Sequence, residues 1–542
     1  MLDAISDALN SGLLKSVLTL LRMLFYVLCL GTIYALCVSN SGIKEQSKKP
    51  KGKKFSSVVL IPFLLLVTTG FCYILIYQTT WQLSGFTSPQ FVQFMERYNP
   101  RTDNAAHKLI RGEILDSKGR VLAKTQPNSY ITRTYPYGPI TAHIVGYRHP
   151  TEGLTGLENA ADYILSGYSL DKESQLKAAG ENALKDVRNV GTNLVLTIDV
   201  DLQQRAYELM NGRKGAVVAI DPDTGAIKVL LSSPSYNPNE FTRELLIDKS
   251  APLLNRALHG QYPAGSTFKT LIAALMLEQG VSQNQPCPAE GYYAPGARRP
   301  IRDHEYYTYE KRGLKWHGFG SLDLDTALAK SSNTYFARVG VESGVDAFNN
   351  LIQRLGFKER YILFEGDSGR ISTRESKIPF LEKGMRRELS QLSIGQGRLA
   401  MTPFHMAMLA SAFANANGDI MTPRIAENMP ISVYSEGFSK NVAARVRKAM
   451  RYVVTNGTGK GANLTGLDVC GKTGTAQNPG GDDHSWFICF NNSGKQHLAI
   501  AVIVENAGFG SSAALPVAVG ILQAANASDP EAPAHNMIGG AQ

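Results

Sequence analysis

Cysteine is scarce in this chain, with 6 in 542 residues. Cys29, Cys37 and Cys72 fall in apolar runs, which leaves an odd number elsewhere and excludes the disulfide framework of a small secreted domain. Cys470 and Cys489 could face each other across a predicted hairpin. Two buried free thiols are the interpretation that we favour.

Signatures of metal and nucleic-acid binding are missing as well. His304 and Glu305 have no second histidine at zinc-protease spacing, so no metal site is predicted there. The net charge of +10 raises the question of a nucleic-acid partner, but six lysines are concentrated in residues 44–54. No zinc spacing, RNA-binding aromatic signature or basic helix is present. Nucleic acid is therefore not predicted as a partner, and nothing indicates a cofactor.

Two long apolar segments, residues 17–38 and 58–77, mark the amino-terminal region. Each is about as long as a bilayer-spanning helix. The lysine-rich segment between them (39–57) is predicted to be a cytoplasmic loop, which places the rest of the chain outside the cytoplasm. No convincing cleavage site follows the second segment, which is predicted to be an uncleaved anchor. The first, interrupted by Arg22, either spans the membrane, as we prefer, or lies on its surface.

At 542 residues the chain is expected to form two or three units. Residues 1–85 form the membrane anchor region, and residues 86–190 mix short strands and turns without a convincing pair of catalytic side chains. Residues 191–528 alternate strand and helix patterns and are predicted to be an α/β domain. Residues 529–542 are predicted to be a flexible tail.

The pattern within the third unit predicts specific elements. Strands are predicted at 193–198, 216–220 and 227–231, and an amphipathic helix at 202–210. The later predicted elements are a helix from Ser266, a hairpin that pairs the strand of Lys472 with residues 485–490, and a closing helix at 515–525. Residues 285–320 are an aromatic and basic insertion. A loop of this length is usually functional or mobile, so it either lines a substrate groove or is a solvated decoration.

Ser266 and Lys269 are the first candidate catalytic pair. They follow a Tyr-Pro-Ala-Gly turn and precede an apolar run, and their spacing puts them on one face of a helix. A lysine that is partly desolvated and close to a second cation loses its proton more easily, and it can then accept the serine proton. Similar spacings at residues 41–44 and 174–177 have no apolar helix behind them.

Two further elements follow in sequence order. Ser331 and Asn333 come directly after the helical-looking residues 322–329. A Lys-Thr-Gly triplet that occurs once in the chain lies on a predicted strand. The triplet and the threonine after it are Lys472, Thr473, Gly474 and Thr475. The three elements in this order are hard to explain by chance.

Together, these elements resemble the motif set of the penicillin-recognising serine acyltransferases. Over residues 111–520 the chain resembles class B penicillin-binding proteins, which are monofunctional peptidoglycan D,D-transpeptidases. The supporting stretches are 111–116 with Gly119 and 122–123, 156–158, 394–397 and 504–506. Ala264, in place of a second proline, and Ser332, at a variable position, are small departures that leave the chemistry intact.

The resemblance implies an α/β (α+β) transpeptidase domain whose antiparallel sheet is covered by helices on both faces. It also implies that residues 86–190 are a non-catalytic pedestal, in which Arg111 and Glu113 are interpreted as members of structural ion pairs at the domain junction. The expected location is the bacterial cell membrane, with the catalytic domain on its extracytoplasmic side. The expected partners are D-alanyl-D-alanine stem peptides, β-lactams and a membrane-embedded peptidoglycan glycosyltransferase.

The implied mechanism assigns a role to each motif residue. Ser266 attacks the stem peptide to form an acyl-enzyme, and neutral Lys269 accepts its proton. Ser331 relays a proton to the leaving D-alanine, and Asn333 holds Lys269 and the donor amide. Lys472 supplies positive charge.

The other motif residues are expected to bind substrate. Thr473 and Thr475 would bind its carboxylate, and Gly474 would let a peptide lie along the edge strand. The backbone amides of Ser266 and Thr475 are the candidate donors to the developing oxyanion.

Other activities share parts of this pattern. A D,D-carboxypeptidase differs only in accepting water in place of an amine, and the sequence separates the two poorly. A β-lactamase rarely needs an anchor and a pedestal. A β-lactam sensor would need more cytoplasmic chain than the lysine-rich loop offers. Transpeptidation is the function that we predict.

Overall fold

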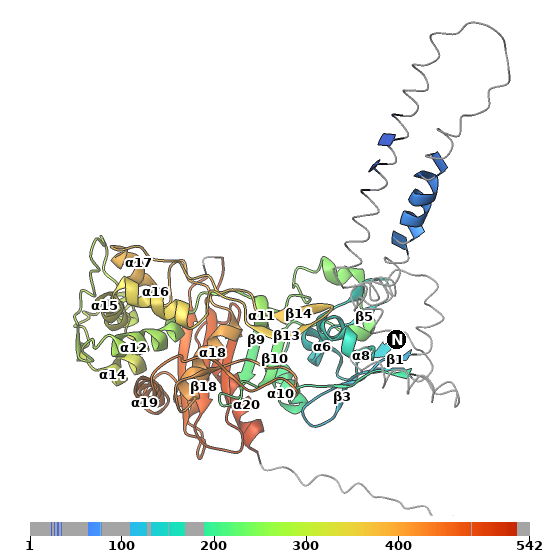
Figure 1. Cartoon of the computed structure of the whole chain (residues 1–542). Coiled ribbons are helices and arrows are strands. Elements are labelled where there is room, and N and C mark those ends of the chain that lie inside the picture. Colours follow the sequence, from blue (N-terminus) through green and yellow to red (C-terminus); the bar gives the residue numbers. More distant parts are fainter. Residues whose placement is uncertain are drawn as a thin grey trace, which may run out of the picture. The chain divides into compact units, whose positions relative to one another are not determined.

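The computed structural model describes residues 109–126, 132–149, 151–167, 189–478 and 480–527, with a few helical residues between positions 23 and 78 (Figure 1). The chain divides into two compact units, residues 1–105 and 106–542. Within the described residues, no helix is both long and apolar enough to cross a membrane. The predicted segments at 39–57 and 529–542 lie outside the described residues, as does most of 17–38, whereas the described residues of 58–77 are helical.

A five-stranded antiparallel sheet forms the centre of the carboxyl-terminal part of the described chain (Figure 1). In spatial order its strands are β10 (Ile227–Ser233), β9 (Gly215–Ile220), β19 (Ala499–Val504), β18 (His484–Asn491) and β17 (Val469–Ala476). The strand of Lys472 therefore lies at an edge and pairs with β18, which confirms the predicted hairpin.

Both faces of this sheet are buried. Val217 and Val502 point into a core shared with α10 (Val200–Met210) and α20 (Ala514–Asn526), whereas Val218 and Ile503 point into the main core that contains α18 (Pro403–Ala414). Alternate residues of a strand face opposite sides, so a strand covered on both sides must be apolar throughout. That explains the continuous apolar runs of β9 and β19.

A helical region packs beside β17. Its members are α12 (Lys269–Glu278), α14 (Leu324–Lys330), α15 (Asn333–Ser343), α16 (Val345–Arg354), α17 (Arg386–Leu392) and α19 (Lys440–Asn456). Helix α19 lies against both β17 and α14. The active-site motifs are carried by α12, by the junction of α14 and α15, and by β17, so packing between these elements determines the geometry of the site.

Cys470 and Cys489 are free and buried. In the β17–β18 ladder Cys470 pairs with Phe490, and Gly471 pairs with Cys489. The two thiols are one register position apart and belong to different cores on opposite faces of the sheet. The favoured prediction of free thiols is confirmed, and the alternative of a cross-hairpin contact is excluded.

The amino-terminal part of the second unit has a small mixed sheet. Its strands, in order, are β4 (Arg133–Thr134), β3 (Val121–Thr125), β2 (Ile114–Leu115) and β8 (Leu194–Val195). Strand β8 pairs in parallel with β2, although the sequence pattern assigned residues 193–198 to the third unit. The chain therefore returns to the pedestal sheet before it enters α10.

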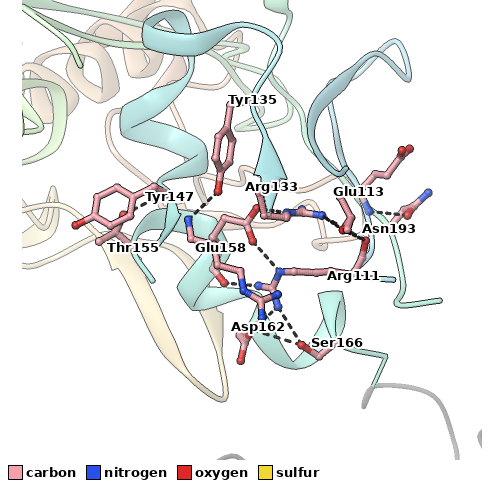
Figure 2. A network of polar contacts seen from close by, with 12 residues as sticks. Arg111, Glu113, Arg133, Tyr135, Tyr147, Thr155, Glu158, Asp162, Ser166 and Asn193 are labelled. Carbon is pink, nitrogen blue, oxygen red and sulfur yellow. Dashed lines mark hydrogen bonds and ion pairs between the residues drawn. The ribbon is translucent and has the colours of Figure 1, made fainter. Parts of the chain in front are cut away.

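A buried ion-pair network holds the pedestal together (Figure 2). Arg111 donates from Nε to Oε2 of Glu158 at 2.7 Å and also contacts Asp162, and Arg133 donates to Oε1 of Glu158 at 2.8 Å. Burial alone would raise the pKa of Glu158, but the two guanidinium groups hold it below its ordinary value. An ion pair of Arg111 is thus confirmed, but it lies within the pedestal, where it joins the 111–116 and 156–158 stretches, and not at the domain junction.

Glu113 does not take part in that network. Figure 2 shows its carboxylate turned away from Arg111, and its backbone N–H donates to Oδ1 of Asn193 at 2.8 Å. Among the described residues no ion pair of Glu113 is found. The described residues therefore do not support the interpretation of Glu113 as an ion-pair residue. At the neighbouring Gly112, a Cβ would lie 2.1 Å from the backbone oxygen of Thr192, so the backbone of this stretch packs tightly against the segment that leads into β8.

Candidate active site

Ser266 lies in a short 3-10 helix, η5 (Gly265–Phe268), that runs directly into α12 at Lys269. In a 3-10 helix, residues three apart lie one above the other, so the serine and the lysine face the same side. Ser266 is half-buried, and Lys269 has no exposed surface. The prediction of a regular helix from Ser266 is thus modified, because the first turn is tighter than an α-helix.

Close backbone packing holds the Ser266 turn against β17. Gly265 has a φ of +54°, and a Cβ there would lie 2.5 Å from the backbone oxygen of Thr475. A Cβ at Gly474 would meet the side chain of Thr267 at 2.8 Å. Gly474 is therefore required by the close approach of the serine turn, which is a different reason from the predicted room for a peptide.

The second motif lies where α14 ends and α15 begins. Ser331 has left-handed backbone angles (φ 57°, ψ 37°), which are uncommon for a residue other than glycine. Ser332 follows as the N-cap, and its hydroxyl accepts from the N–H of Tyr335 at 3.1 Å. This sharp junction lets Ser331 and Asn333 both reach the amine of Lys269.

The structure brings the two lysines together at Ser331. Nζ of Lys269 donates to the backbone oxygen of Ser331 at 2.6 Å, to Oδ1 of Asn333 at 2.7 Å and to Oγ of Ser331 at 3.3 Å. Nζ of Lys472 donates to the same Oγ at 3.0 Å and to the backbone oxygen of Thr473 at 2.8 Å. Among the described residues, the Lys269 amine donates to these groups rather than to the Ser266 hydroxyl.

Both amines are buried among neutral hydrogen-bond acceptors. Burial lowers the pKa of Lys269 to about 7, while the carboxylates of Asp303 and Glu305 attract its proton and offset part of that effect. Burial, and then the charge of Lys269, lower the pKa of Lys472 well below its ordinary value. Each amine repels a proton on the other. The two carboxylates favour a proton on Lys269.

The threonines of the third motif lie along the edge strand. Oγ1 of Thr473 is 2.6 Å from Oγ1 of Thr458, which comes from the segment after α19. Thr475 borders an open cavity of about 650 Å³ where β17 ends. The rest of its lining is Gly481, Asp482, Asp483, Asn506, Ala507, Gly508 and Phe509.

The turn before Ser266 is anchored by a residue of the 504–506 stretch. Glu505 accepts from the hydroxyl of Tyr262 at 2.7 Å and from Nε of Arg256 at 2.9 Å. Nε1 of Trp486 donates to the backbone oxygen of Pro263 at 2.9 Å. Sequence reasoning quoted Glu505 only as a supporting resemblance, but it holds the segment that carries the serine.

The 285–320 insertion contacts the second motif. The backbone oxygen of Arg302 accepts from Nδ2 of Asn333 at 3.0 Å, and Asp303 accepts from the Ser332 hydroxyl at 2.9 Å. In α13 (His304–Lys311), the ring of His304 lies edge-on to Phe509, with 6.2 Å between the centroids. The start of the insertion is therefore part of the site, and the sequence pattern did not single out Asp303.

In the described part of the chain, no group of three metal-ligating side chains is found.

Comparison with known families agrees with this architecture. Residues 215–523 match the model of the penicillin-binding protein transpeptidase domain, and residues 111–193 match that of the penicillin-binding protein A dimerisation domain. The peptidoglycan D,D-transpeptidase MrdA of Haemophilus influenzae is 31% identical over 457 residues, which cover 72% of this chain and 68% of that protein. MrdA of Acinetobacter baumannii is 30% identical over 450 residues, which cover 71% of this chain and 64% of that protein.

Solved structures show the same fold. Penicillin-binding protein A from Mycobacterium tuberculosis, as a ceftriaxone acyl-enzyme complex, has a TM-score of 0.67 and 26% identity, and covers 78% of this chain and 99% of that one. PBP2 of Pseudomonas aeruginosa, in complex with WCK 5153, has a TM-score of 0.63 and 28% identity, with 77% and 95% coverage. On this evidence, the chain belongs to the penicillin-binding transpeptidase family, as a class B penicillin-binding protein.

Proposed function

We propose that this protein is a membrane-anchored peptidoglycan D,D-transpeptidase that cross-links stem peptides through an acyl-enzyme at Ser266. One observation carries the proposal: the amines of Lys269 and Lys472 meet at the Ser331 hydroxyl, and the turn that holds Ser266 packs against the strand that carries Lys472. The MrdA relatives are named as enzymes of this activity, and the penicillin-binding protein A structure is a β-lactam acyl-enzyme.

In the acylation step, Oγ of Ser266 bonds to the carbonyl carbon of the penultimate D-alanine, and its proton passes to Lys269. The bond from that carbon to the terminal D-alanine nitrogen breaks. That nitrogen takes a proton through the hydroxyl of Ser331, which lies within hydrogen-bonding distance of both lysines. General acid–base transfer of this kind typically accelerates a reaction by about 10² to 10⁴.

Substrate binding prepares Lys269 for this role. An incoming carboxylate at Thr473 and Thr475 places negative charge near Lys472 and so favours the proton on that amine. A charged Lys472 then repels a proton on Lys269, which leaves Lys269 as the neutral base. The free site, where Asp303 and Glu305 favour a charged Lys269, is thereby less reactive than the occupied one.

The donor peptide is proposed to lie along β17, which has a free edge. With its carboxylate near Thr473 and its reactive carbonyl between the amides of Ser266 and Thr475, the remaining stem peptide runs past Thr475. It would then enter the cavity where that strand ends. Preset amide donors stabilise the oxyanion that forms in the transition state.

In the second half of the reaction, the amine of a neighbouring stem peptide attacks the acyl carbon. The new carbon–nitrogen bond closes the cross-link, and Oγ of Ser266 leaves and recovers a proton. Water in place of the amine would make the protein a carboxypeptidase. A β-lactam enters the first step as a strained acyl donor, and its leaving group stays attached.

Membrane attachment and a polymerising partner also belong to the proposal. The apolar segments at 17–38 and 58–77 and the lysine-rich loop between them support an anchored protein with its catalytic domain outside the cytoplasm. A membrane-embedded glycosyltransferase would supply the glycan strands. Fusions of a cytoplasm-dependent reporter after Gly42 and after Gly85 test the topology: activity is expected only at Gly42, and activity at Gly85 would contradict it.

The activity is tested by labelling with fluorescent penicillin and by a cross-linking assay on glycan strands with pentapeptide stems. Wild-type protein is expected to take up the label and to form cross-linked dimers, and Ser266→Ala is expected to lose both while it stays folded. Labelling that survives in Ser266→Ala would put the nucleophile elsewhere. Release of D-alanine without dimers would identify a carboxypeptidase, and rapid nitrocefin turnover a β-lactamase.

A further inference from the structure

The insertion supplies a buried carboxylate that neither the motif pattern nor the mechanism above uses for positioning. Asp303 lies at the start of α13 and is 2% exposed. We propose that Asp303 is a positioning residue for the second motif: it holds the segment 331–333 in the conformation that lets Ser331 and Asn333 engage Lys269. The inference rests on the proposed function and deepens it.

The first line of support is the pair of hydrogen bonds made by one carboxylate oxygen. Oδ1 of Asp303 accepts from the hydroxyl of Ser332 at 2.9 Å and from the N–H of Thr334 at 3.0 Å. Ser332 stands between the two catalytic members of its motif. Because its hydroxyl donates to Asp303, its oxygen is free to accept from the N–H of Tyr335 as the N-cap of α15.

These contacts satisfy N–H groups at the start of α15 that lack partners within the helix. The hydroxyl of Ser332 accepts from the N–H of Tyr335, and Asp303, which lies outside the helix, accepts from the N–H of Thr334. A negative charge is also favourable at the positive end of the helix dipole. The insertion thereby fixes where α15 begins, directly after the left-handed Ser331, whose backbone conformation persists only if its surroundings hold it.

The residue before Asp303 acts on the same motif. The backbone oxygen of Arg302 accepts from Nδ2 of Asn333 at 3.0 Å. With its nitrogen committed to that carbonyl, the amide of Asn333 presents Oδ1 to Nζ of Lys269 at 2.7 Å. Two consecutive insertion residues therefore orient the middle and the last residue of the motif.

The carboxylate also acts through its charge. In the described structure, Oδ2 of Asp303 is buried and has no hydrogen-bond partner. The charged groups that face Lys269 are Asp303 and Glu305 from the insertion and Lys472 from β17, while Ser331 and Asn333 offer neutral acceptors. Both carboxylates raise the pKa of Lys269, so loss of the Asp303 charge lowers that pKa.

Positioning and charge are separated by two substitutions. Asp303→Ala removes both, and the acylation rate with fluorescent penicillin is expected to fall on the order of tenfold to a hundredfold at the optimal pH, as for a displaced catalytic group. Asp303→Asn keeps an acceptor oxygen, so a rate within a few-fold of wild type is expected. The acidic side of its pH–rate profile should move to lower pH, because without the Asp303 charge Lys269 loses its proton at a lower pH.

Glu310→Gln is the matched control, because it removes an exposed carboxylate from the same insertion. Neither rate nor pH profile should change in it. Two results together would overturn the inference: acylation rates of the Asp303 variants that fall only in proportion to the folded fraction, and a pH profile of Asp303→Asn that matches wild type. If Asp303→Ala does not fold, the profile of Asp303→Asn decides alone. Labelling that survives Ser266→Ala would instead overturn the proposed function, so the two failures can be told apart.

Discussion

Two buried ionic clusters in this molecule follow opposite rules. In the pedestal, Glu158 lies between Arg111 and Arg133, so every charge has an opposite partner at hydrogen-bonding distance. In the active site, Lys269 and Lys472 are equally buried but share the neutral hydroxyl of Ser331.

The difference teaches what each cluster is for. Opposite charges in a low-dielectric interior stabilise one another and keep both groups ionised, and the pKa of Glu158 is accordingly low. In the active site, burial lowers the pKa of Lys269, and burial followed by the charge of Lys269 lowers the pKa of Lys472. A paired cluster holds structure together, whereas a cluster with a displaceable proton can carry out acid–base chemistry.

The largest effect is expected from a substitution that breaks the active-site cluster. Lys269→Met removes the base, and the acylation rate with fluorescent penicillin is expected to fall by about 10² to 10⁴. Stability should change little, because removal of a buried amine offsets the loss of its hydrogen bonds to Ser331 and Asn333. Lys228→Met, at a half-buried position of β10, is the control and should acylate normally. A folded Lys269→Met that acylates at the wild-type rate would exclude Lys269 as the base.

The next largest effect is expected from a substitution that breaks the pedestal cluster. Glu158→Gln leaves two buried guanidinium groups without their shared carboxylate, and the free energy of unfolding is expected to fall by about 3 to 5 kcal/mol. The acylation rate per folded molecule should not change. The control is Glu152→Gln, whose ion-pair partner Arg243 is 78% exposed, and it should unfold almost as wild type does. Equal stability of the two variants would show that the buried network stabilises nothing.

The smallest effect is expected from a change of pH, which should act on the active-site cluster but not on the pedestal cluster. Lys269 works as a base only when neutral, and burial lowers its pKa to about 7. The acylation rate is therefore expected to fall below about pH 7, by about tenfold for each further pH unit. The carboxylate of Glu158, whose pKa is lowered, stays ionised in that range, so unfolding stability should be retained. A rate that is flat between about pH 7 and pH 5 would contradict the assignment of the base.

Much of the local structure could be read from the chain. The β9–β10 hairpin, helices α10 and α20 and the pairing of β17 with β18 were predicted because strand and helix periods are local properties of apolar patterning. The motif residues were singled out by their spacing and order. Their joint location was expected only from the resemblance, since Lys269 and Asn333 are 64 residues apart, and Lys472 and Ser331 are 141 apart.

Other features depended on long-range packing. The sequence pattern left the insertion as either groove or decoration, and Asp303 looked like any polar loop residue until its carboxylate was found at the start of α15. The close approach that Gly474 permits was not predicted either, because the turn that would meet its Cβ lies more than two hundred residues earlier in the chain. No local periodicity reports such contacts.

The sequence alone determined the types of the main elements, the candidate catalytic residues and the family resemblance. Tertiary structure alone decided that Lys269 and Lys472 are buried and share one hydroxyl, and that the insertion caps the second motif. The physical reason is that residue type and period are set within a few turns of chain. Desolvation, register and the distance between charges exist only after remote segments have packed together.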